Sequence, residues 1–147
     1  MPTVIEYLKD KDATQRDQAL ETIASLGPLA KEAVPTWITM MEKQDIKLYK
    51  NQSGKIHLRD VDDAFLDKMA KTIGKIGTAA VGALVRSLDT TNLNAGLLIG
   101  SCRALGEIGP PAKNNQNTVP ILQKISQSNL PAPICFEADR ALRNIRW

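Results

Sequence analysis

The sequence has few of the residues that build metal sites, disulfide frameworks and catalytic triads: two cysteines and one histidine among 147 residues. Disulfide-stabilised domains carry more cysteines in a shorter chain, so Cys102 and Cys135, both in helix-like stretches, are predicted to be buried free thiols. His57 has no cysteine or second histidine at the spacing of a zinc site. A lone histidine also needs a nucleophile from elsewhere in the fold before it can assist catalysis. We therefore expect no bound metal, no cofactor and no catalytic residue.

Aromatic residues make up only 4% of the chain, and no apolar run reaches the roughly 18 residues of a membrane span. The N-terminal segment has no basic stretch before an apolar one, so no signal peptide is visible. A cytoplasmic location is favoured, and the location is open if the sequence is a piece of a longer protein. The net charge of +3 is smaller than a dedicated nucleic-acid binder usually carries. The length and the 43% hydrophobic content fit one folded domain. Nucleic acid is therefore a disfavoured partner, and no membrane association is expected.

What the sequence does contain is an internal repeat. Four segments align on two apolar positions three residues apart, namely 19–30, 68–80, 102–112 and 138–146. In three of them a glycine follows directly, at Gly27, Gly77 and Gly109. Glycine there ends a helix, because a positive φ is cheap only for glycine. A second apolar block follows each of these three, at 33–41, 80–88 and 118–126. Each unit is therefore predicted to be two helices joined by a tight turn.

These blocks resemble the HEAT-repeat family, in particular its short bacterial form with the pattern ALGxIGPxAxxAVPxL, and the match is closest over 26–35. The second copy departs from the pattern at Thr78 and Gly82, where prolines are usual. The resemblance implies an all-α fold, a right-handed α-solenoid of stacked helix pairs in a single domain over 1–147. Its expected parts are a half unit (2–10), unit one (12–43), an insertion (44–60), unit two (61–89), unit three (92–128) and a terminal helix (132–147).

Small residues occupy one aligned position in the first helices of three units, at Ala24, Gly74 and Gly106. Glycine inside a helix costs about 1 kcal/mol relative to alanine, which is a reason to expect close packing there. We therefore predict that helices approach one another closely at this position. Among the larger apolar residues, Trp37, Met40 and Met41 are predicted to fill the core.

The insertion accounts for the extra length between cap glycines, which is 50 residues from Gly27 to Gly77 but 32 from Gly77 to Gly109. Apolar and polar residues alternate on both sides of NQSG (51–54), which is the period of a strand around a turn. This predicts a β-hairpin at about 45–59 with Leu48 opposite Leu58. The face away from these leucines would carry Lys47, Tyr49, His57 and Arg59, with Lys55 at the turn. Either the hairpin only covers a helix pair, or it is a basic finger that contacts an acidic partner or phosphate.

In the HEAT family the second helices generally line the concave side, so the resemblance implies a contact surface there. Its polar positions are Thr36, Thr39, Lys43, Arg86, Gln123 and Lys124. The predicted partner-binding residues, from this strip and the finger together, are Lys47, Tyr49, Lys55, His57, Arg59, Thr39, Lys43, Arg86 and Lys124.

The leading hypothesis for function is a non-catalytic protein–protein interaction scaffold, one module of a larger protein or assembly, with another protein as its partner. One alternative is a chromophore-attachment subunit like the phycobilin lyases, in which similar short repeats occur. The other is weak nucleic-acid or anion binding through the basic insertion at 43–59, which would weaken as salt is added.

Both ends of the sequence fall in the middle of a unit, with a lone second helix first and a lone first helix last. Solenoids normally carry polar caps at their ends. Here Ile5, Tyr7 and Leu8 at one end and Ile145 and Trp147 at the other are predicted to be uncapped. The sequence is therefore expected to be either a piece of a longer protein or a chain that self-associates end to end.

Overall fold

The computed structural model describes residues 2–8, 12–44, 46–54, 56–59, 62–88 and 94–146, and the fold is all-α in class, as predicted. The α-helices are α1 (Pro2–Leu8), α2 (Ala13–Leu26), α3 (Val34–Glu42), α4 (Asp63–Ile76), α5 (Val81–Ser87), α6 (Ala95–Ile108), α7 (Thr118–Ser126) and α8 (Ala132–Arg146). Short 3-10 helices, η1 (Gly27–Ala33), η2 (Gly77–Ala80) and η3 (Pro110–Asn114), and two strands, β1 (Lys47–Lys50) and β2 (Ile56–Arg59), complete the described elements.

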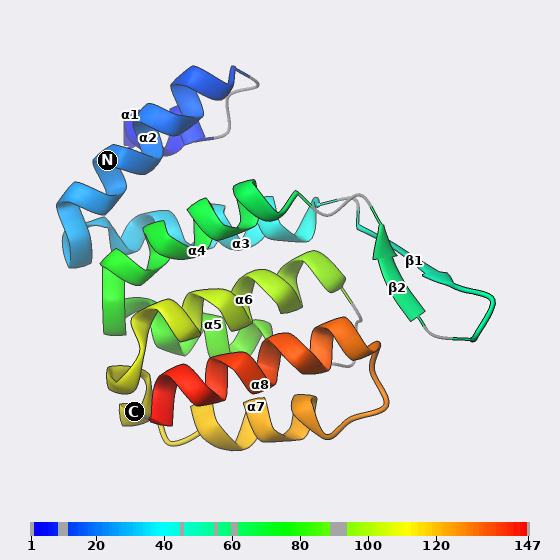
Figure 1. The fold of residues 1–147 in the computed structure, drawn as a ribbon. Helices are drawn as coiled ribbons and strands as arrows, with labels where there is room; N and C mark the ends of the chain where they lie inside the picture. Colours follow the sequence, from blue (N-terminus) through cyan, green and yellow to red (C-terminus); the bar gives the residue numbers. More distant parts are fainter. Residues whose placement is uncertain are drawn as a thin grey trace.

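The helices lie in two layers (Figure 1). Helices α2, α4, α6 and α8 pack side by side in chain order and form the first layer. Helices α3, α5 and α7 form the second layer, in which α5 contacts both α3 and α7. Each of the turns η1, η2 and η3 leads from a first-layer helix to a second-layer helix, and successive turns touch one another along one edge. Equivalent positions of successive units therefore face the same side of the molecule.

Helix ends follow the residues that the sequence offers. The first-layer helices α2, α4 and α6 begin after Asp12, Asp62 and Asn94, whose side chains accept hydrogen bonds from backbone amides of the first turn. The same helices end at Gly27, Gly77 and Gly109, where φ is +58°, +77° and +76°. The positive φ predicted at these glycines is confirmed, and it turns the chain directly into a 3-10 helix.

Replacing Gly77 by alanine tests this geometry in isolation, because no atom lies within 4 Å of the position its Cβ would take. The backbone there has φ +77° and ψ −144°, a region that side chains with a Cβ rarely adopt. We expect Gly77→Ala to lower the free energy of unfolding by about 1–2 kcal/mol in a urea titration. A loss below about 0.5 kcal/mol, the usual effect of a surface substitution, would contradict this account.

The core lies between the two layers and consists of aliphatic side chains together with Trp37. Trp37 and Met41 are fully buried and Met40 is partly buried, so the predicted core role is confirmed. The Trp37 Nε1 donates a hydrogen bond of 3.0 Å to the carbonyl of Met69, which ties α3 to α4. A buried indole N–H needs such a partner, because an unpaired donor in the core is costly.

The predicted close approach of helices is confirmed at two of the three small residues. A Cβ at Gly74 of α4 would lie 2.9 Å from the Cβ of Glu107 on α6. A Cβ at Gly106 of α6 would lie 3.2 Å from the Nδ2 of Asn144 on α8. Both contacts join neighbouring helices of the first layer, so these glycines set the spacing between units.

Strands β1 and β2 pair antiparallel, with Lys47 opposite Arg59, Leu48 opposite Leu58, Tyr49 opposite His57 and Lys50 opposite Ile56. Gly54 in the turn has a φ of +80°. The pair extends beyond the ends of the helix layers (Figure 1), and β2 also contacts α8.

The ends of the chain differ from the prediction of uncapped apolar residues. Leu8 is 1% exposed and Ile145 is 0% exposed, so for these two the prediction is wrong. The reason is that α1 packs along α2, and α8 packs along α6 and α7. Ile5 is partly buried, Tyr7 is 46% exposed, and Trp147 lies outside the described residues. Within the described part of the chain, no helix is both long and apolar enough to cross a membrane.

Candidate functional site

The predicted contact residues of the second layer come from three neighbouring helices. Thr39 lies on α3 and Lys43 is the residue that ends it, while Arg86 lies on α5 and Lys124 on α7. All four residues are exposed. Because α5 packs against both α3 and α7, these residues share one face of the molecule, here called the second-layer face.

Three of these residues occupy the same place in the repeat. Aligning the second helices on Val34, Val81 and Val119 makes Thr39, Arg86 and Lys124 equivalent. The Thr39 hydroxyl donates a 3.1 Å hydrogen bond to the carbonyl of Pro35, so its proton is already used within α3. The two cations make no ion pair with any described residue.

The residues predicted to form a basic finger lie along the strands. Lys47 begins β1 and is exposed. Tyr49 lies on β1, and His57 and Arg59 lie on β2; for these three the structure describes the backbone. Lys55 lies outside the described residues. The hairpin begins at Lys47, shortly after α3 ends at Glu42. Among the predicted contact residues of the second layer, Lys43 is therefore the nearest to the hairpin along the chain.

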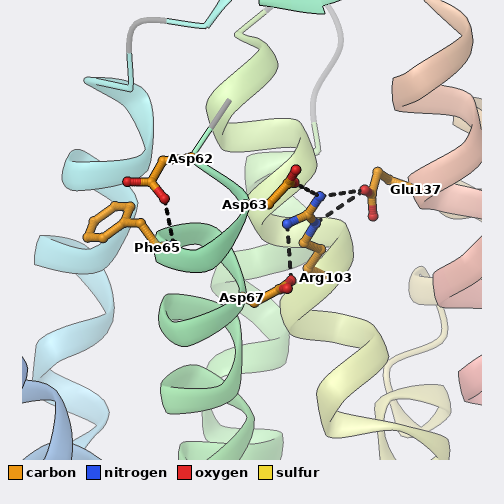
Figure 2. A network of polar contacts seen from close by, with 6 residues as sticks. All are labelled: Asp62, Asp63, Phe65, Asp67, Arg103 and Glu137. Atoms are coloured by element: carbon orange, nitrogen blue, oxygen red, sulfur yellow. Dashed lines mark hydrogen bonds and ion pairs between the residues drawn. The ribbon is translucent and has the colours of Figure 1, made fainter. Parts of the chain in front are cut away.

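A polar cluster that the sequence did not predict lies in the first layer and joins three helices (Figure 2). Arg103 of α6 donates to Asp63 and Asp67 of α4 at 2.8 and 3.0 Å. On its other side the same guanidinium donates two hydrogen bonds to Oε1 of Glu137 on α8, at 3.2 and 2.9 Å. Four hydrogen bonds from one side chain therefore connect α4, α6 and α8.

Burial distinguishes one strong ion pair in the cluster from two weaker ion pairs. The side chains of Arg103 and Glu137 are 13% and 11% exposed, while those of Asp63 and Asp67 are 71% and 57% exposed. Burial alone would lower the pKa of Arg103, but the hydrogen bonds and charges of the carboxylates, Glu137 first, raise it above its ordinary value. The arginine is therefore a permanent cation, and its pair with Glu137 holds most of the cluster's energy.

A small pocket lies beside the cluster between α6 and α8, and Cys102, Gly106 and Asn144 contribute to its lining. Its volume is about 40 Å³, far below the roughly 300 Å³ at which small-molecule sites begin. Cys102 itself is fully buried, and burial, followed by the charge of Glu137, raises the pKa of its thiol well above the ordinary value. The group is therefore a neutral thiol, which is a poor nucleophile.

This protonation state predicts the reactivity of Cys102. In a Cys135→Ser variant at pH 8, we expect Cys102 to react with a disulfide reagent at least about 100-fold more slowly in buffer than in urea. The thiolate is the reacting form, and both the raised pKa and the burial of the sulfur suppress it. Absorbance of the released thiol measures the rate, and equal rates in buffer and urea would rule out the buried thiol.

The sequence does hold a signal for the cluster. Arg103 is the one charged residue in the largely apolar run from Ala95 to Leu105. A charge in such a run is buried only when it is paired. Its partners lie 34 to 40 residues away along the chain, so the pairing depends on how the helices stack.

A comparison with solved structures found a protein of similar fold. A crystal structure of an engineered protein, a Northeast Structural Genomics Consortium target, resembles this chain with a TM-score of 0.51 and 22% sequence identity. The likeness covers 97% of this chain and 61% of that protein, so this chain spans less than two thirds of it. At that identity the likeness shows the fold alone. No protein-family model and no curated protein matches the sequence.

Proposed function

We propose that the protein is a non-catalytic protein-interaction scaffold, built as a right-handed α-solenoid of HEAT-like helix pairs, and that a protein partner binds its second-layer face. The observation that carries the proposal is the recurrence of exposed side chains at one repeat position, at Thr39, Arg86 and Lys124. Recurring positions on stacked units create an extended surface, which is the usual binding surface of repeat proteins.

The buried polar residues support a structural role for the first layer. Arg103 uses its hydrogen bonds on Glu137 of α8 and on two carboxylates of α4. Cys102 is held as a neutral thiol. These groups stabilise the stack, which leaves the second-layer face as the surface for recognition.

Affinity capture tests the proposal. The immobilised protein, an Arg86→Glu/Lys124→Glu variant and a Lys71→Glu/Lys75→Glu variant are compared on an extract of the source cells. Lys71 and Lys75 are exposed on α4, so the second variant changes the net charge equally in the other layer. We expect bound proteins that are retained by the α4 variant and lost from the α5/α7 variant.

Two results would overturn the proposal. One is the same set of bound proteins with both variants, because binding would then not use the second-layer face. The other is a bilin-type absorbance that stays with the purified protein, which would favour the chromophore-attachment alternative.

A further inference from the structure

Three exposed cations, on α5, on α7 and at the end of α3, mark the second-layer face. Arg86 and Lys124 are exposed at equivalent positions of α5 and α7. On α3 the cation is Lys43, which lies one turn beyond Thr39 and so on the same side of the helix. None of the three makes an ion pair with a described residue, and they are therefore available to carboxylates of a partner.

The surface around these cations is partly apolar. One turn before Arg86 and Lys124, Ala83 and Ile121 occupy equivalent positions, and both are half-buried against the core. Gly82 lies beside Ala83, and the Nη1 of Arg86 is 3.6 Å from the position that a Cβ at Gly82 would take. The guanidinium of Arg86 therefore lies along α5, next to the apolar side chain of Ala83.

The spacing of the helices that carry these cations favours one conformation of the partner. Helices packed side by side are about 8–10 Å apart. In a polyproline II segment, residues i and i+3 face the same side at a separation of about 9 Å. Residues on one face of a β-strand are about 7 or 13 Å apart, and one or two α-helical turns rise about 5 or 11 Å, so neither matches as well as the 9 Å repeat.

We infer that the second-layer face binds an acidic peptide segment in the polyproline II conformation, with carboxylates three residues apart that meet Arg86 and Lys124. The peptide residues between the carboxylates pack on the apolar side chains of Ala83 and Ile121. The inference rests on the proposed function and names the chemistry of its partner.

A defined probe tests the inference. A fluorescent peptide with Glu-Pro-Pro repeated four times is titrated with the protein at low salt and followed by anisotropy. An isomer with four consecutive glutamates followed by eight prolines has the same composition and charge. We expect the repeating peptide to bind at least about fivefold more tightly than the isomer, because only its carboxylates match the helix spacing.

Variants locate the binding surface. Arg86→Glu/Lys124→Glu should weaken binding of the repeating peptide at least about tenfold, since it replaces two attractive contacts by repulsive ones. Lys71→Glu/Lys75→Glu should change the affinity for this peptide less than about threefold, which is the effect expected from the change in net charge alone. Circular dichroism verifies that both variants are folded.

Three outcomes would overturn the inference: equal affinity for the two peptides, equal effects of the two variants, or no binding at millimolar peptide. Tighter binding of heparin or of a single-stranded oligonucleotide that is lost in the α5/α7 variant would also overturn it, in favour of a general polyanion site. With any of these outcomes, the proposed function still holds if the Arg86→Glu/Lys124→Glu variant loses protein partners in the capture experiment. The two failures are therefore distinguishable.

Discussion

Replacing Arg103 by methionine is expected to lower the free energy of unfolding by about 3–5 kcal/mol, the usual cost of removing one partner from a buried ion pair. The methionine keeps much of the aliphatic volume, so loss of packing is a minor part of the change. The variant leaves the carboxylate of Glu137 without its neutralising cation, in a residue that is only 9% exposed. Its Oε2 already lacks a hydrogen-bond partner among the described residues, so the whole group depends on Arg103. Urea titration monitored by circular dichroism measures the effect.

Variants of the partners separate charge from packing. Asp63→Asn and Asp67→Asn should each cost less than about 1 kcal/mol, because these side chains are mostly exposed and solvent screens their attraction to Arg103. Arg103→Met combined with Glu137→Leu should recover most of the stability lost in the single variant, because no buried charge is left unpaired. If the double variant were as unstable as Arg103→Met alone, the account based on the uncompensated carboxylate would be wrong.

The helix boundaries could be predicted from the sequence because they depend on local chemistry. Gly27, Gly77 and Gly109 end helices through their own backbone freedom, and each acts within one turn of its helix. The contacts of Gly74 and Gly106 could also be predicted, although they join different helices. In that case the repeat itself supplied the information, since a small residue at one aligned position implies the same packing in each unit.

The Arg103 cluster could not be predicted in the same way, because it does not repeat. The residues equivalent to Arg103 in α4 and α8 are Lys71 and Arg140, and both are exposed. Its buried partner Glu137 comes from α8, and the equivalent positions in α4 and α6 hold Lys68 and Gly100, so no other unit offers this pair. Features that are unique to one unit thus required the structure.

Gly96 belongs to this second group, and it leads to the other large expected effect. A Cβ at Gly96 in α6 would lie 2.5 Å from the backbone carbonyl oxygen of Met41 and 2.9 Å from the Cβ of Gln44. The end of α3 therefore meets the first turn of α6 nearly backbone to backbone. The side chain of Asn94 fixes this contact, because its Nδ2 donates a 2.9 Å hydrogen bond to the carbonyl of Glu42.

Alanine at this position should therefore be harmful even though alanine is the better helix former. We expect Gly96→Ala to lower the free energy of unfolding by about 3 kcal/mol, at the upper end for an overpacked site, since backbone must move to make room. For a domain of this size that corresponds to a fall of roughly 6–12 °C in Tm. Gly82→Ala is the matched control: its Cβ would meet only the end of the flexible Arg86 side chain, at an ordinary contact distance of 3.6 Å. It should raise stability by up to about 1 kcal/mol, because alanine is favoured over glycine inside a helix. Calorimetry of the two variants decides the matter, and equal shifts of Tm in the same direction would show that helix propensity, and not the contact between α3 and α6, governs Gly96.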